Sequence, residues 1–357
     1  MTPKTAYYAA MAEEAAKQVT GTRERWTGFL TTAGRLYKYP YHEQLMIHAQ
    51  RPDATACAEY DLWNEKMNRY VKRGSKGIAL IDNSGERPRL RYVFDVSDTG
   101  ARRNSRPVYL WKMKDEYRDS VQNALEKAFG VPANGKSLEN QIDDVARTLA
   151  TEYWNEHKRE IIDILDNSYL EGYDELNTGV SFKNAATTSI TYAIYSRCME
   201  NPDELFEHED FLDIFDFNTQ ATANALGSAV SELSSQVFRE IEVTIRNNEL
   251  SKQAERSQNY DERTDLQTGR GLFNPELGAD TRRNEAVREV RANEENIPAG
   301  AQTDNIQSHD SDGDTVSAPL RSGRDSEPQT DTVDEPVSSE QSSSRQGDTA
   351  DVVGSAH

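Results

Sequence analysis

The sequence predicts an α+β N-terminal domain followed by an all-α domain and a disordered C-terminal tail, covering residues 1–112, 113–250 and 251–357. Three observations support this division. Strand-like runs occur only in the first block, whereas apolar residues recur at helical spacing through the second. From Lys252 onward, Tyr260 and Phe273 are the only aromatic residues. Such a tail cannot bury enough apolar surface to offset the entropy lost on ordering.

The first block combines three helices with a predicted hairpin. Helical spacing predicts helices over residues 5–17, 23–37 and 42–50, and Pro40 ends the second of them. A short helix is expected over residues 60–67. The runs 77–81 and 90–96 predict two strands, because they are alternating or apolar and a turn at Asn83–Gly85 separates them.

The second block contains three apolar stripes at intervals of three and four residues, and it has no convincing strand. This spacing places the apolar side chains on one face of each helix, which predicts a helical bundle or layered α domain. The stripes are Leu138, Ile142, Val145 and Leu149; Phe182, Ala186, Ile190 and Ile194; and Leu226, Val230, Leu233, Val237 and Ile241.

Charge is divided unevenly along the chain. The net charge is −20, but residues 1–112 hold 19 Lys and Arg against 12 Asp and Glu, so the excess of acid lies in the remainder. Such asymmetry indicates that the first block meets nucleic acid, although two unrelated domains can also simply differ in charge. No run approaches the roughly 18 apolar residues of a membrane span. We therefore expect a cytoplasmic protein without a membrane partner. Cys57 and Cys198 are expected to be buried, reduced thiols.

Basic and aromatic residues cluster around the predicted strands. Basic side chains neutralise phosphates and an aromatic face stacks on bases, so this pattern favours a nucleic-acid-binding surface. If the strands form a hairpin, Arg89 and Arg91 share one face with Val93, while Leu90, Tyr92 and Phe94 point the other way. A solvated, charged hairpin with a core of aromatic residues is the alternative. The candidate binding residues are Lys66, Arg69, Tyr70, Lys72, Arg73, Lys76, Arg89 and Arg91.

Several short motifs in this region occur in the order found in one known family. They are the Ala/Thr-rich run 54–58, Trp63, the basic turn Val71–Ile78 and the segment Val93–Thr99. About residues 20–112 resemble the N-terminal domain of ArdC-type antirestriction proteins. The resemblance implies sequence-independent binding of single-stranded DNA and residence on plasmids or integrative conjugative elements. Trp63 is nevertheless expected in the core, because Tyr60 and Met67 lie at helical spacing from it.

No catalytic residues, metal ligands or cofactor are predicted. Many ArdC-type proteins carry a following metallopeptidase-like domain with a His-Glu-x-x-His motif, which this sequence lacks. Phosphate-loop, dinucleotide-binding and nucleophile-elbow motifs are also missing from the sequence. Residues 182–240 are faintly similar to the distal helices of that peptidase-like domain, so the second block is hypothesised to be a degenerate scaffold without its zinc site.

The sequence thus favours a single-stranded-DNA-binding protein that is accessory to DNA transfer or antirestriction, with proteins of the conjugation or restriction machinery as further partners. Three alternatives stay open. The acidic helical block could act on a protein partner, the chain could be the N-terminal part of a larger helicase or methylase protein, or it could hold an enzyme site that no motif reveals.

Overall fold

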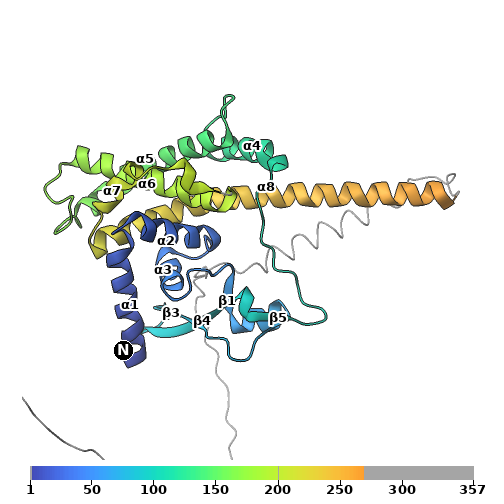
Figure 1. Ribbon diagram of the computed structural model, residues 1–357, viewed down its shortest axis with the longest axis horizontal. Helices are drawn as coiled ribbons and strands as arrows, with labels where there is room; N and C mark the ends of the chain where they lie inside the picture. Colours follow the sequence, from blue (N-terminus) through green and yellow to red (C-terminus); the bar gives the residue numbers. More distant parts are fainter. Residues whose placement is uncertain (1, 200, 269–357) are drawn as a thin grey trace, which may run out of the picture. The chain divides into compact units, whose positions relative to one another are not determined.

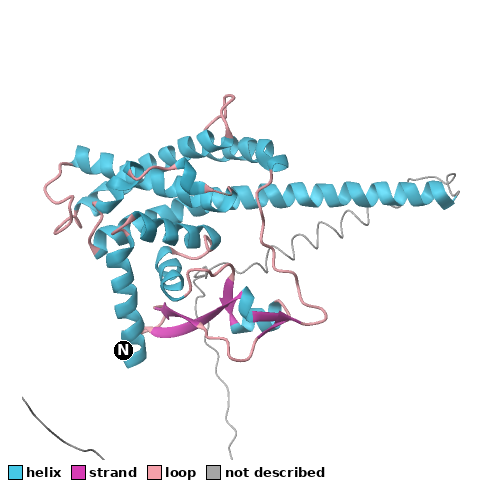
Figure 2. Ribbon diagram, in the orientation of Figure 1, coloured by secondary structure: helices cyan, strands magenta, loops and turns pink. Residues whose placement is uncertain are grey.

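The computed structural model describes residues 2–199 and 201–268, with side chains described up to residue 257. The described chain is mostly helical, with a small antiparallel sheet region near the N-terminus (Figures 1 and 2). The helices are α1 (Pro3–Val19), α2 (Arg23–Arg35), α3 (Tyr41–Gln50), α4 (Arg118–Phe129), α5 (Leu138–Ile162), α6 (Glu175–Cys198), α7 (Leu212–Phe215) and α8 (Gln220–Thr268).

Most of the long helices begin at a side chain that caps free backbone amides. The hydroxyl groups of Thr2, Thr22 and Ser137 accept hydrogen bonds from amides one turn into α1, α2 and α5. Asp174 does the same for α6 with its carboxylate. Each cap satisfies a donor that the first helical turn leaves unpaired, which fixes where the helix starts.

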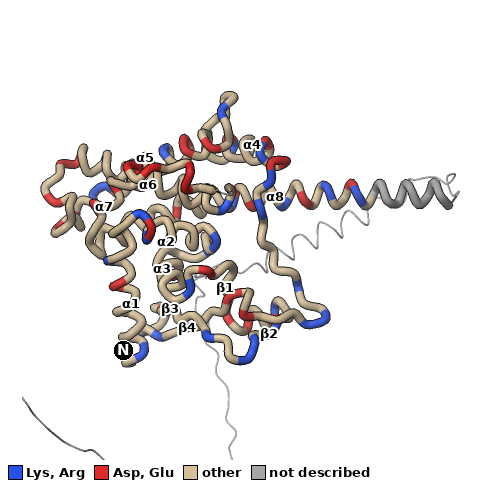
Figure 3. The backbone as a smooth tube through the Cα atoms, in the orientation of Figure 1, with Lys and Arg blue, Asp and Glu red and all other residues tan. Residues whose placement is uncertain are grey.

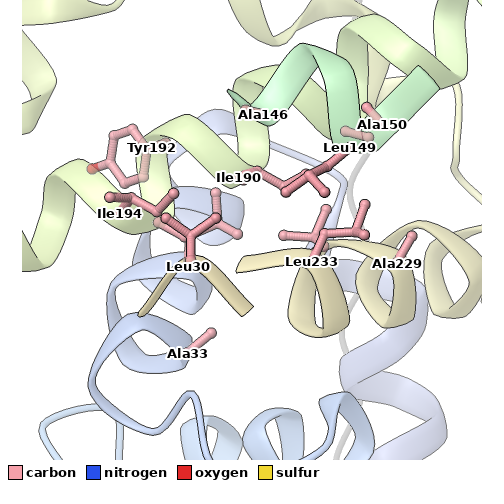
Figure 4. Packing of buried hydrophobic residues seen from close by; sticks show 14 of the residues in the cluster. Leu30, Ala33, Ala146, Leu149, Ala150, Ile190, Tyr192, Ile194, Ala229 and Leu233 are labelled. Atoms are coloured by element: carbon pink, nitrogen blue, oxygen red, sulfur yellow. The ribbon is translucent and has the colours of Figure 1, made fainter. Parts of the chain in front are cut away.

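The main hydrophobic core lies where α2, α4, α5, α6 and α8 meet. All three predicted stripes are buried there, which confirms the helical spacing seen in the sequence. Figure 4 shows part of this packing, with Leu149 of α5, Ile190 of α6 and Leu233 of α8 converging on Leu30 of α2. Such close packing of apolar side chains is the main source of stabilisation.

The boundary expected at residue 112 does not divide this core. Trp26, Phe29 and Leu30 of α2 are at most 1% exposed and belong to the same cluster as the stripes of the second block. Trp26 donates its indole N–H to the Ser189 hydroxyl over 2.9 Å. The described residues accordingly fall in one compact unit. The charge break therefore reflects the surface, whereas the fold is set by apolar contacts that cross residue 112.

Two small antiparallel sheets lie among the first 101 residues. One has the order β1 (Cys57–Glu59), β4 (Arg89–Asp95), β3 (Ile78–Asp82), and the other pairs β2 (Arg69–Val71) with β5 (Thr99–Ala101). The predicted hairpin is confirmed, with Ile78 opposite Val93 and Leu80 opposite Arg91. The strands β1, β2 and β5 were not predicted, and each has only three residues.

The three-stranded sheet has its own hydrophobic cluster against α3. Ile78, Leu80 and Val93 pack with Met46 and Ile47, and all five are at most 4% exposed. At the edge of β3, the Gln50 side chain exchanges two hydrogen bonds with the backbone of Ala79, at 2.8 and 2.9 Å. The amide of Gln50 thus replaces a neighbouring strand at an edge that would otherwise be open.

The predicted tail begins later than expected, because α8 continues through residues 251–268. This stretch is rich in Gln, Glu, Arg and Lys, which are good helix formers. Extending an existing helix avoids the cost of nucleating a new one, so a polar segment can remain helical without a core of its own. The rest of the predicted tail, residues 269–357, lies outside the described residues. None of the described helices is long and apolar enough to cross a membrane.

Candidate nucleic-acid interface

The predicted basic cluster lies on the β2–β5 pair and its flanking loops, which we call the basic ribbon (residues 66–77 and 99–106). Val71 pairs with Thr99, and the amide of Lys72 donates to the carbonyl of Asp98 over 2.8 Å. The basic turn Val71–Ile78 and the segment Val93–Thr99 are therefore neighbours in space. This contact gives a structural reason for both motifs to occur together.

The turn after β2 is held in a fixed conformation. Gly74 has a backbone φ of +87°, in the left-handed region that side chains other than glycine rarely adopt. The amide of Ser75 closes the turn on the carbonyl of Lys72 over 3.2 Å. The ammonium group of Lys72 also donates to the carbonyl of Ser97 over 2.8 Å. Because a carbonyl has no net charge, Lys72 keeps its positive charge.

Six of the eight predicted residues come together on the ribbon. Lys66, Arg73 and Lys76 are exposed, and Arg69 donates its Nε to the Thr99 hydroxyl over 2.8 Å. Among the side chains that the structure describes, no carboxylate lies within salt-bridge distance of Lys66, Arg69, Lys72, Arg73 or Lys76. Their positive charge is therefore available to an anionic partner.

Arg89 and Arg91 lie apart from the ribbon and are already paired. Arg91 stands opposite Leu80, on the sheet face that packs on α3, and contacts Glu43 at 2.5 Å and Glu59 at 3.0 Å. Arg89 contacts Asp82 across the hairpin at 2.7 Å. The predicted face shared with Val93 is correct, and this face is buried at Val93 but exposed at Arg89, whose side chain is 71% exposed. Arg91 thus ties the sheet to α3, and both arginines belong to the three-stranded sheet, whereas the ribbon is built on the other sheet.

Tyr70 lies across the ribbon from Gly100 and is 44% exposed. A Cβ atom at residue 100 would lie 2.3 Å from Cζ of Tyr70, so the ring occupies the space that a side chain there would fill. The guanidinium carbon of Arg102 lies 5.8 Å from the ring centroid. Tyr70 is thereby held at the ribbon surface among cations, which suits an aromatic group that stacks on a base.

Replacing Gly100 with alanine is expected to displace the Tyr70 ring. The free energy of unfolding should fall by roughly 1–3 kcal/mol, the usual cost of inserting an atom into a filled space. In a Tyr70→Ala background, the same change should be neutral or stabilising, because alanine loses less entropy than glycine in a strand. Urea unfolding of the four proteins in this double-mutant cycle measures the coupling. Equal effects of Gly100→Ala in both backgrounds would contradict the contact.

Three further cations on the ribbon were missed by the sequence analysis. Arg102, Arg103 and Arg106 are exposed in the loop after β5. Arg102 donates to the carbonyl of Arg69 over 2.9 Å and to the Asn64 side chain over 2.7 Å. Three arginines within five residues were the signal in the sequence, and only the pairing of β5 with β2 places them beside the predicted cluster. Figure 3 shows Lys and Arg along this part of the chain.

The carboxylate of Asp95 holds the base of the ribbon in place. One oxygen accepts from the amides of Thr55 and Ala56 at 2.7 and 2.9 Å, and the other from the amide of Ser97 at 2.9 Å. Burial by itself would raise the pKa of Asp95, which is 1% exposed, but the hydrogen bond from the Ser97 hydroxyl and those from the three amides outweigh it and hold the pKa below its usual value. Asp95 therefore acts as a structural anion that connects two loops.

Trp63 is buried, as expected from its helical spacing. Its residue is 1% exposed, and its indole N–H donates to the carbonyl of Phe94 over 2.8 Å. The segment Leu62–Lys66 is a short π-helix that packs Trp63 against β1 and β4. Trp63 therefore supports the ribbon from beneath and offers no exposed face for stacking.

The described part of the chain contains no group of three or more His, Cys, Asp or Glu residues arranged to hold a metal ion. The arrangement on the ribbon is suited to electrostatic binding and stacking, and it places no general base next to a nucleophile. Comparisons with protein-family models, with curated proteins and with solved structures found no match to the chain.

Proposed function

We propose that the protein binds single-stranded DNA through the basic ribbon, largely independently of sequence. The observation that carries this proposal is the group of ribbon cations without carboxylate partners among the described side chains, set around the half-exposed ring of Tyr70. Arg89 and Arg91 provide a contrast, because both are already paired with carboxylates. The cations are Lys66, Arg69, Lys72, Arg73, Lys76, Arg102, Arg103 and Arg106.

A single strand fits this surface better than a duplex. Basic groups would contact the phosphates of either, but an aromatic side chain can stack only on a base that is not already stacked in a helix. Stacking contributes roughly 1–3 kcal/mol per base and depends little on base identity. The ribbon therefore supports affinity that is sensitive to salt and tolerant of sequence.

The resemblance to the ArdC-type domain supports the same proposal and extends it. It favours a cytoplasmic protein of a plasmid or integrative conjugative element, accessory to DNA transfer or antirestriction. Proteins of the conjugation or restriction machinery would then be additional partners. In the competing hypothesis, the acidic helical block acts on a protein partner and the ribbon is only a solvated surface.

Reversing charge at Arg73 and Lys76 tests the proposal. Both side chains are exposed, and changing both to glutamate should leave the fold intact. Affinity for a labelled single-stranded oligonucleotide, measured by fluorescence anisotropy across a salt series, should fall roughly 10–100-fold at low salt. The slope of log affinity against log salt should decrease by about 0.7 for each phosphate that the variant no longer neutralises.

A matched control reverses two exposed cations outside the ribbon, Lys127 on α4 and Arg239 on α8. The control carries the same change in net charge, so it should keep most of the affinity. Equal decreases in both variants would mean that the overall charge matters and that the ribbon has no special role. No binding of the unaltered protein at low salt would favour the protein-partner hypothesis.

A further inference from the structure

A cavity of about 620 Å³ lies between the sheets and the helices, next to the basic ribbon. Its walls come from the end of α2 and the loop after it (residues 35–39), residues 55–57, the segment 106–111 that leads from β5 toward α4, and side chains of α6 and α8. Trp63 and Met67 also line it. Figure 1 shows this connecting segment as it runs from β5 to α4. The volume is within the range of pockets that hold small ligands.

The cavity is lined by more positive than negative charge. Arg35, Lys38, Arg106, Arg197 and Arg246 face a single carboxylate, Glu242. This carboxylate is already engaged, because it accepts from the Tyr37 hydroxyl and, over 2.9 Å, from the ammonium group of Lys38.

Arg197 is the most enclosed cation in the cavity. Its guanidinium carbon lies 4.1 Å from the centroid of the Trp111 ring, and its Nε has no hydrogen-bond partner among the described residues. Burial lowers the pKa of this guanidinium, although arginine remains charged at neutral pH. Glu242 lines the same cavity but is bonded to Tyr37 and Lys38 and makes no salt bridge to Arg197, so a further anion near Arg197 would be favourable.

Aromatic and apolar side chains line the cavity close to these cations. Tyr109 is 39% exposed and Leu110 is 45% exposed, beside the buried ring of Trp111. The Tyr109 hydroxyl donates to Glu249 over 3.1 Å, and the guanidinium carbon of Arg246 lies 5.9 Å from its ring centroid. These contacts hold the Tyr109 ring at the mouth of the cavity, where it can contact a planar group.

We propose that this cavity binds one nucleotide unit, with its phosphate near Arg197 and Arg246 and its base against Tyr109. Cations alone would accept any anion, and apolar side chains alone would accept any hydrophobic group. The combination selects a ligand that joins a planar ring to an anion. Such a unit can be a free mononucleotide or one nucleotide of a bound strand, and only the second source rests on the proposed function.

The cavity and the ribbon are directly connected. Arg106 lines the cavity, and its amide donates to the carbonyl of Met67 over 2.9 Å. Met67 follows Lys66 of the ribbon and also lines the cavity. A strand bound along the ribbon would therefore run close to the wall of the cavity.

Isothermal titration calorimetry of the full chain tests the proposal with deoxyadenosine monophosphate, inorganic phosphate and deoxyadenosine as separate probes. The nucleotide should bind more tightly than either part alone. Arg246→Gln and Tyr109→Leu should each weaken it by about tenfold or more, which is the usual consequence of removing a charged or stacking partner. Thermal unfolding of both variants shows whether they keep the fold.

The source is identified by a second arm with a single-stranded oligonucleotide. In one outcome, Arg246→Gln weakens binding of the free nucleotide and the Arg73→Glu, Lys76→Glu variant leaves it unchanged. This outcome assigns the cavity to a free nucleotide, even if the ribbon binds no DNA. Oligonucleotide binding that both variants weaken, without binding of the free nucleotide, assigns the cavity to a base of the strand. Inorganic phosphate bound as tightly as the nucleotide, or no effect of Arg246→Gln in either arm, overturns the proposal.

Discussion

A fragment that ends at Lys112 should fail to fold, although it contains every described strand and every basic residue of the candidate site. The reason is the position of α2, whose side chains Trp26, Phe29 and Leu30 are buried against α6 and α8. Each fully buried side chain of this kind contributes roughly 1.5–3 kcal/mol. Exposing all three thus costs about as much as the 5–15 kcal/mol by which a typical domain is stable.

Circular dichroism and urea unfolding of residues 1–112 and of residues 1–268 provide the measurement. The longer protein should unfold cooperatively and show the near-ultraviolet signal of packed aromatic residues. The shorter one should show neither. A cooperative transition in residues 1–112 would mean that the sheets and α1–α3 form an independent domain, and that their packing against α6 and α8 contributes little.

Helices were predictable from the sequence because the spacing of apolar residues that specifies a helix lies within one short segment. The stripe from Leu226 to Ile241 is buried along its length, as its spacing predicts, since helical periodicity alone decides which side chains share a face. The hairpin was predictable for a similar reason, because two strands of adequate length flank one turn. The strands β1, β2 and β5 have three residues each, too few to show an alternation.

The candidate site was only partly predictable, because the role of each cation depends on partners far away in the sequence. Nothing local distinguishes Arg91, which contacts Glu43 on α3, from Arg73, which is exposed without a carboxylate partner among the described side chains. The cavity was not predictable at all. Its cation Arg197 and its aromatic residue Tyr109 are 88 positions apart and line the same cavity only in the folded chain.

Replacing Asp95 should weaken the sheet region. Changing it to alanine leaves the amides of Thr55, Ala56 and Ser97 without their acceptor. An unsatisfied buried donor costs about 1–3 kcal/mol, and water can reach part of these loops, so the free energy of unfolding should fall by roughly 2–4 kcal/mol. The exposed Asp61, changed to alanine, is the matched control and should have little effect.

The same carboxylate should make stability depend on pH in the acid range. Its pKa in the folded protein lies below the value of about 3.9 in an unfolded chain, so the unfolded state takes up protons first as the pH falls. The contribution of Asp95 is therefore complete above that pH and is lost as the pH falls through the lower pKa of the folded state. Asp95→Asn removes this titration and keeps the size of the side chain.

Urea unfolding of both proteins between about pH 2.5 and 6 brackets the range in which carboxylates titrate. The difference in the free energy of unfolding between the unaltered protein and Asp95→Asn should become smaller as the pH falls. A difference that stays constant over this range would show that the charge of Asp95 is not what holds the two loops together.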